Sequence, residues 1–144
     1  MQDVRIDRFH AYAAAFETAY RTDDWTVLEP FFTEDVVSEL NGAQTSGRAA
    51  VIRAFRDSVA AFDRRFDARE MRLIEGPALA DGVVHIKTAN TYHRDGLEPL
   101  ELFGEEWFSF DGDRIVRHAD RVLNADRVMD YLGRHLADLR PLAA

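Results

Sequence analysis

Strand-like segments alternate with tight turns in the second half of the sequence, and this pattern constrains the fold most. Four segments rich in aromatic and β-branched residues cover 68–75, 83–94, 100–110 and 114–123. Strong turn signals lie between them, at Gly76-Pro77, Asp81-Gly82, Asp95-Gly96 and Asp111-Gly112. The second half therefore predicts a sheet of consecutive antiparallel strands.

The first half shows helical spacing instead. Apolar stripes predict helices over 3–22 and 48–63, with Ser46 as the cap of the second. Between them we expect a short helix, capped by Asp23 or Asp24 and interrupted by Pro30, and a strand over 36–40. A last amphipathic helix is predicted over 124–139. Helices followed by a run of strands indicate a single α+β domain over 1–144.

The segment from Glu105 to Asp120 predicts a hairpin with the loop Asp111-Gly112-Asp113. Counting back from a three-residue loop gives the pairs Phe110 with Arg114, Phe108 with Val116, Trp107 with Arg117, and Glu106 with His118. Asp120 then lies on the face of His118, roughly 6.5 Å further along the strand. Two carboxylates and an imidazole would cluster there, whereas a two-residue loop would set Glu106 against Ala119 and separate them.

The other candidate ligand-binding residues come from one predicted face of the sheet and from the helices. Alternation over 83–94 places Asn90 and Tyr92 beneath the helices, where they and Tyr12 would donate hydrogen bonds to a carbonyl or enolate oxygen. The expected apolar walls of the pocket are Phe16, Leu40, Phe55 and Phe108. If the opposite face of the hairpin pointed inward, the pocket would suit an anionic ligand, because its lining would be Glu105, Trp107, Arg117 and Arg121.

Composition argues against several classes of function. Lys and Arg total 18 against 26 Asp and Glu, and the basic residues are scattered, so nucleic acid is not an expected partner. The absence of cysteine excludes disulfides and thiolate chemistry. No nucleotide loop, serine elbow or metal-ligand spacing occurs, and we expect neither cofactor nor metal. Without a signal-peptide pattern or a membrane-spanning apolar run, a soluble cytoplasmic protein is predicted.

Three short motifs carry a resemblance to a known family: Phe31-Phe32-Thr33-Glu34-Asp35-Val36, Gly47-Arg48-Ala49-Ala50-Val51-Ile52, and the hairpin from Phe110 to His118. Together they resemble the SnoaL-like branch of the nuclear transport factor 2-like superfamily over nearly the whole chain. The resemblance implies a cone-shaped fold, in which N-terminal helices pack on a curved, mostly antiparallel sheet and enclose a pocket. It also implies a homodimer formed through the outer face of the sheet.

Within that superfamily, polyketide cyclases carry an acid before the final turn and a histidine after it, a pattern similar to Glu106 and His118. The catalytic Tyr and Asp of ketosteroid isomerases correspond to Phe16 and Leu40, so the resemblance does not support their mechanism. Limonene epoxide hydrolases share a counterpart of Asp120, but their Arg and Asp correspond to Thr88 and Asn90.

These comparisons favour a cofactor-independent acid–base enzyme acting on a small, largely apolar carbonyl compound, by aldol cyclisation or isomerisation. Glu106, or His118 polarised by Asp120, would remove a proton next to the carbonyl. Two alternatives stay open: a non-catalytic module that binds a small apolar or aromatic ligand or only dimerises, and an epoxide hydrolase-like enzyme that uses Asp120.

Overall fold

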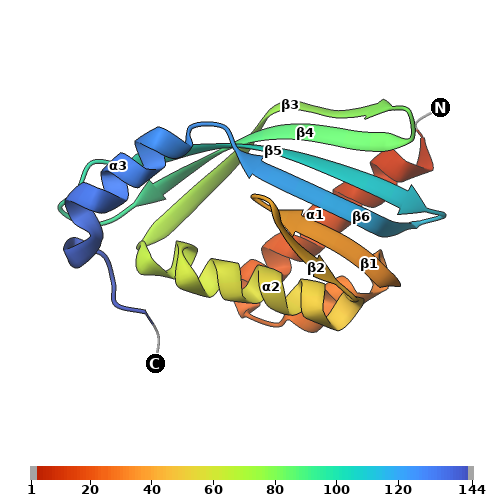
Figure 1. Cartoon of the computed structure of the whole chain (residues 1–144), viewed down its shortest axis with the longest axis horizontal. Helices are drawn as coiled ribbons and strands as arrows, with labels where there is room; N and C mark the ends of the chain where they lie inside the picture. Colours follow the sequence, from red (N-terminus) through yellow and green to blue (C-terminus); the bar gives the residue numbers. More distant parts are fainter. Residues whose placement is uncertain (1–2, 143–144) are drawn as a thin grey trace.

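The computed structural model describes residues 3–142 and contains a six-stranded sheet with helices on its concave side. The strands follow the order β2 (Ala43–Ser46), β1 (Phe32–Leu40), β6 (Arg114–Val122), β5 (Leu100–Asp111), β4 (Val83–His93) and β3 (Ala68–Ala80). All neighbouring pairs are antiparallel except β1 with β6, which are parallel. Helices α1 (Val4–Thr22) and α2 (Arg48–Ala61) pack under the sheet, and α3 (Ala125–His135) lies beyond its end (Figure 1). The α+β class and the curved sheet are confirmed.

The helices follow the predicted stripes, but their caps differ from those expected. The Asp3 carboxylate accepts a hydrogen bond of 2.8 Å from the Arg5 amide and caps α1. Asp24 caps the 3-10 helix Trp25–Phe31, which tolerates Pro30. The prediction that Ser46 caps α2 is wrong: Gly47 is the N-cap, its φ is 93°, and no side chain caps the helix. Ser46 instead ends strand β2 (Ala43–Ser46), whose pairing with β1 uses its backbone.

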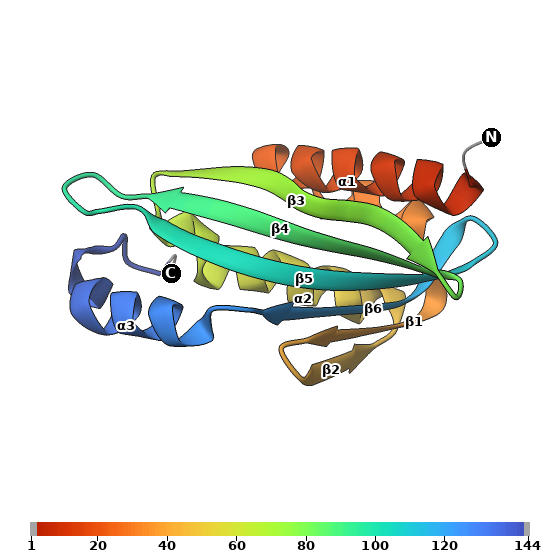
Figure 2. The same ribbon diagram turned by 90° about the horizontal axis from the view of Figure 1, so that it is seen from above.

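Two strands are longer than the sequence predicts. Strand β1 spans Phe32–Leu40, and β3 (Ala68–Ala80) continues past Gly76-Pro77, which we expected to end it. The pairing of β3 with β4 (Val83–His93) is irregular there, so the extra residues bend β3 without ending it. This bend contributes to the curved outline of the sheet seen from above (Figure 2).

The hairpin of β5 (Leu100–Asp111) and β6 (Arg114–Val122) has a different register from the predicted one. Its loop is the two-residue turn Gly112-Asp113, and an extra residue, Val116, shifts the register between Ser109 and Phe110. Glu106 therefore lies opposite Asp120, and His118 opposite Phe108. The predicted pairing of Glu106 with His118 is wrong by two residues. Since the turn and the bulge together preserve parity, the three polar side chains still share one face.

Buried side chains form two clusters along the inner face of the sheet. The larger joins α1, α2 and the sheet through aromatic contacts, with Phe108 5.2 Å from Phe9 and 5.4 Å from Tyr12 between ring centroids. The smaller lies below α3 and includes Tyr92 and Tyr131. Among residues 3–142, no helix is both long and apolar enough to cross a membrane.

Gly76 is the glycine at which we expect substitution to destabilise the fold most. Its φ is 83°, and a Cβ atom there would lie 2.5 Å from the His85 carbonyl oxygen, closer than such atoms approach. Gly76→Ala should lower the free energy of unfolding by about 2 kcal/mol or more. Gly133→Ala is the matched control, because Gly133 lies in α3 with open space around it, and it should raise that energy by up to about 1 kcal/mol. Urea unfolding of both variants measures the two changes, and equal stability of Gly76→Ala and the parent would contradict the prediction.

Candidate active site

A cavity of about 650 Å³ lies between the helices and the inner face of the sheet. It is within the size range of small-molecule sites in proteins. Every residue predicted to contact a ligand lines it: Tyr12, Phe16, Leu40, Phe55, Asn90, Tyr92 and Phe108. Glu106, His118 and Asp120 line it as well. The cavity is therefore open to a ligand and presents a few polar groups in a mainly apolar wall.

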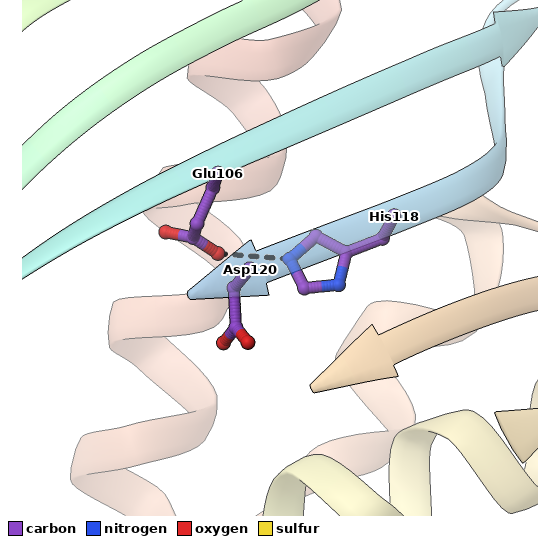
Figure 3. A group of neighbouring side chains, drawn as sticks. All are labelled: Glu106, His118 and Asp120. Atoms are coloured by element: carbon purple, nitrogen blue, oxygen red, sulfur yellow. Dashed lines mark hydrogen bonds and ion pairs between the residues drawn. The ribbon is translucent and has the colours of Figure 1, made fainter. Parts of the chain in front are cut away.

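Glu106, His118 and Asp120 converge on the side of the sheet that faces the helices (Figure 3). Glu106 projects from β5, and the other two project from β6. His118 Nε2 lies 2.9 Å from Glu106 Oε1. Asp120 forms no hydrogen bond with either of these two side chains, and its Oδ1 accepts a hydrogen bond of 3.1 Å from the Asn41 amide. Of the two carboxylates in this cluster, that of Asp120 is therefore the one available to a ligand.

The His118 ring is held from all sides. Its exposed fraction is 2%, and its Nδ1 lies 2.9 Å from the hydroxyl oxygen of Ser38, which is fully buried on β1. The rings of Phe55 and Phe108 contact it with centroids 5.2 Å and 5.0 Å away. If Glu106 accepts the hydrogen on Nε2, Ser38 donates to Nδ1 and selects a single neutral tautomer. His118 is therefore an oriented, buried imidazole with both nitrogens engaged.

The pKa of Asp120 differs from that of an ordinary surface carboxylate. Its pKa is raised to about 6, first by burial and then by the charge of Glu106, while His118 and the Asn41 amide oppose the shift. Burial also raises the pKa of Tyr12 well above its usual value, with smaller contributions from Glu106 and Asp120. Tyr12 is thus a neutral phenol at physiological pH, and it lines the same cavity as the two carboxylates.

Asn90 and Tyr92 lie at a different end of the same cavity. Glu106 pairs with Ile86 of β4, and Asn90 is four residues further along that strand, which is roughly 13 Å. Asn90 Oδ1 is 3.4 Å from Arg69 Nη1, and the Tyr92 hydroxyl is 3.4 Å from Asp63 Oδ2. The sequence predicts that these two residues bind the same carbonyl group as the Glu106–His118–Asp120 cluster. The structure instead separates them from that cluster.

The alternative in which the odd-numbered face points inward is not observed, since neither Trp107 nor Arg117 lines the cavity. Glu105 and Arg121 contribute to its lining, but the Glu105 carboxylate is bound on the opposite face of the sheet, by His85 Nε2 at 2.8 Å and Arg121 Nε at 2.8 Å. Trp107 lies between these two partners, with its ring centroid 5.5 Å from that of His85 and 5.5 Å from the Arg121 guanidinium. A homodimer through this outer face stays a prediction.

The inner cluster also has the composition of a cation site. One ligand atom each from Glu106, His118 and Asp120 lie within 4.8 Å of one another. Two carboxylates and one imidazole suit a divalent cation, although His118 Nε2 would then have to give up its contact with Glu106. The sequence-based expectation of a site without metal stays a prediction.

Several polar residues of the cavity region were missed from the sequence, and three of them matter most to the site: Ser38, Asp63 and Arg69. Strand alternation was a usable signal for two of them. Ser38 shares a face with Val36 and Leu40, and Arg69 shares a face with Met71 and Leu73, so each is a polar residue in an apolar row. Asp63 follows α2 and shows no such signal, since its burial arises only when the helix docks on the sheet.

Comparison with known proteins places the fold. The model of the SnoaL-like domain family matches residues 12–118, while the sequence matches no curated protein. Similar solved structures include a nuclear transport factor 2-like protein from Anabaena variabilis, at 12% identity and TM-score 0.68, with 85% of this chain and 93% of that chain covered. AclR from Streptomyces galilaeus, a proposed hydroxylase, has 14% identity, TM-score 0.64, and coverage of 90% and 98%.

A proposed SnoaL-like polyketide cyclase from Shewanella putrefaciens is also similar, at 13% identity and TM-score 0.60, covering 85% of this chain and 84% of the other. At such identities the solved structures indicate a shared fold and no particular reaction. The family match spans most of the chain and includes β1, β5 and the part of β6 that carries His118. This chain belongs to the SnoaL-like domain family.

Proposed function

We propose that the protein is an acid–base enzyme that removes a proton next to the carbonyl group of an apolar ligand, using Asp120 as the base. The observation that carries this proposal is the position of Asp120: a half-buried carboxylate beside Glu106, in the wall of an apolar cavity, with its pKa raised to about 6. A carboxylate with a pKa near the working pH is both ionised and unusually basic, as general-base catalysis requires.

Asp120 is preferred over Glu106 and His118 because those two residues are engaged with each other. Glu106 holds His118 Nε2 at 2.9 Å, and Ser38 holds Nδ1 at the same distance. Glu106 acts here through its charge, which raises the proton affinity of Asp120. His118 is a positioning residue, because it keeps Glu106 next to Asp120 and can spread the negative charge of the pair.

In the proposed reaction, the C–H bond next to the carbonyl breaks and its proton passes to Asp120. The electron pair forms a C=C bond, and the carbonyl oxygen becomes an enolate oxygen. The Tyr12 phenol, kept neutral by burial, donates a hydrogen bond to that oxygen. The proton then returns from Asp120 to another carbon, giving isomerisation. Alternatively, the enolate carbon attacks a second carbonyl and forms a C–C bond while the C=O π bond opens to an alkoxide, which takes the proton from Asp120, giving aldol cyclisation.

The alternatives from the sequence differ in their support. A module that only dimerises would fill the cavity with side chains, whereas the cavity is about 650 Å³ and Glu106 lines it. A non-catalytic module that binds a small ligand would have the same open cavity, and the exchange experiment below separates it from an enzyme. An epoxide-opening site would pair Asp120 with an arginine. Among the ion pairs of residues 3–142, Arg121 binds Glu105 and Arg69 binds Glu17, and none joins an arginine to Asp120.

The proposal is tested without knowledge of the natural substrate by proton exchange in 4-acetylbiphenyl. This flat aryl ketone carries exchangeable protons next to its carbonyl, and NMR in D₂O follows their replacement by deuterium. The parent protein should accelerate exchange, and Asp120→Asn should lower the rate by about 100-fold or more, because the base is lost. Asp113→Asn is the matched control on the same hairpin, exposed and outside the cavity. Exchange at the parent rate in Asp120→Asn would exclude Asp120 as the base.

The raised pKa of Asp120 predicts that ionising this carboxyl group, which the proposed reaction requires, lowers the free energy of unfolding. Its folded pKa of about 6 exceeds its ordinary value of 3.8, so the folded state binds the proton more tightly than the unfolded state. The contribution of this group to stability is therefore present below about pH 4 and is lost as the pH rises through about 6.

Asp120→Asn removes that loss, and it should raise the free energy of unfolding at pH 7 by about 1 to 2 kcal/mol, allowing for partial screening by solvent. At pH 4 the variant and the parent should be nearly equal. Urea unfolding at the two pH values measures the difference, with Asp113→Asn again as control. A variant less stable than the parent at pH 7 would show that the Asp120 charge is favourable in the fold.

A further inference from the structure

The end of the cavity remote from Asp120 holds a second group of polar side chains that the proposed reaction does not use. We call Asp63, Arg69, Asn90 and Tyr92 the distal cluster. All four line the same cavity as the Glu106–His118–Asp120 cluster. They come from the segment after α2 and from strands β3 and β4, near the end of β4 that lies beside α3 (Figure 2).

The distal cluster is not a closed structural ion pair. The Arg69 side chain is only 9% exposed, and Glu17 holds its Nη2 with distances of 2.6 and 2.8 Å, but its buried Nε has no hydrogen-bond partner. Buried donors are normally satisfied, and a group left without a partner needs an explanation. The Arg69 guanidinium also stacks on the Tyr20 ring, with its Cζ 3.9 Å from the ring centroid, so the hydrogen-bonding groups left for a ligand at this end are those of Asn90 and Asp63.

Asn90 offers hydrogen-bond donors to the cavity. Its Oδ1 lies 3.4 Å from Arg69 Nη1, and this contact assigns the orientation of the amide, since the guanidinium can only donate. The Nδ2 group then faces away from Arg69, and within residues 3–142 it has no recorded acceptor. A ligand oxygen placed there would accept from it.

Asp63 offers an acceptor beside that donor. Its side-chain hydrogen bond from the Tyr92 hydroxyl is long at 3.4 Å, and the Tyr20 hydroxyl is a second donor to it, whereas a carboxylate can accept several more. Burial is the main cause that raises the pKa of Asp63 to about 6, and Arg69, Arg64 and the two tyrosine hydroxyls oppose the shift. At neutral pH the ionised carboxylate is therefore present, and a further donor from a ligand would stabilise it.

Charge selects the class of ligand group. Glu17 pairs with Arg69, and the positive charges of Arg69 and Arg64 both act on Asp63. The opposite charges at this end of the cavity are therefore close to balanced, and neither a further anion nor a further cation gains an unpaired partner there. A neutral hydroxyl fits both neighbours, because it can donate to Asp63 and accept from Asn90 Nδ2.

We propose that the distal cluster is a second ligand subsite, in which Asp63 and Asn90 bind a hydroxyl group at the far end of an elongated, otherwise apolar ligand. This inference rests on the proposed function for the identity of the other end, the carbonyl at Asp120. Since Asn90 and the β4 partner of Glu106 are separated by roughly 13 Å along the strand, a ligand that reaches both clusters has the length of at least two linked aromatic rings.

Two rigid ketones test the subsite: 4-acetylbiphenyl, and 4-acetyl-4′-hydroxybiphenyl, which adds one hydroxyl at the opposite end. Isothermal titration calorimetry at pH 7 gives the Kd of each. The parent protein should bind the hydroxylated ketone about tenfold more tightly or better, as expected for a hydrogen bond to a charged group. Asp63→Leu should reduce this preference to about twofold or less, because the acceptor is removed.

Thr88→Val is the matched control, since Thr88 lines the same wall two residues before Asn90, and the preference should persist in it. Asn90→Leu provides a second variant that should also lose the preference, in case Asp63→Leu does not fold. Equal affinity for the two ketones in the parent, failure of both to bind, or a preference that survives Asp63→Leu and Asn90→Leu would overturn the subsite.

Failure of the subsite and failure of the reaction give different results. A hydroxyl preference without deuterium exchange of either ketone supports the subsite and removes Asp120 as a base for such carbonyl compounds. Exchange without a hydroxyl preference supports the reaction and overturns the subsite.

Discussion

The register between β5 and β6 is the constraint on which the candidate active site depends. In an antiparallel pair, a shift by one residue moves each side chain to the other face of the sheet relative to its partner. The turn at Gly112-Asp113 alone would align Glu106 with Ala119 and place Glu106 on the face opposite His118. The extra residue at Val116 compensates for the short turn, so Glu106 lies across from Asp120. A small backbone irregularity near the turn thus assembles a cluster several residues away.

Burial gives that cluster its chemistry, and it has a cost. Two carboxylates and an imidazole in an apolar cavity lose hydration, and the two negative charges repel each other. The Ser38 and Asn41 contacts and the packing of Phe55 and Phe108 against His118 offset part of this cost. The remainder appears as the raised pKa of Asp120. The same balance that weakens the fold at neutral pH makes this carboxylate a better base.

The cavity has two polar ends joined by an apolar wall, and this division narrows what the protein can bind. A fold shared with proteins of diverse function does not identify a reaction, so the specificity must come from side chains in the cavity. Under the proposed function, the cluster around Asp120 binds a carbonyl compound that loses a proton. Under the proposed subsite, Asp63 and Asn90 in the distal cluster bind a neutral hydroxyl. A ligand that meets both proposals is long, flat enough to lie along the sheet, and uncharged.

Much of the fold could be predicted because the local sequence patterns, helical stripes and turn signals, agree with the helices and strands of the structure. Helical stripes located α1, α2 and α3, and turn signals located the boundaries of β4, β5 and β6. The errors occurred where backbone pairing overrides local signals. Gly76-Pro77 reads as a turn, yet β4 holds β3 in the sheet on both sides of it. Ser46 reads as a helix cap, yet β1 draws it into β2.

For the site, the sequence by itself determined which side chains of one strand share a face: the alternation of β4 and β6 is a local property of each strand, and it grouped Asn90 with Tyr92 and His118 with Asp120. Only the tertiary structure decided that these faces point inward and that Glu106 of β5 joins His118 and Asp120. It also decided how these residues divide their roles. Ser38 reaches His118 through the parallel pairing of β1 with β6, and Asn90 meets Arg69 through the pairing of β3 with β4. Those contacts join residues far apart in the chain, and their geometry depends on bulges and helix docking that no local pattern encodes.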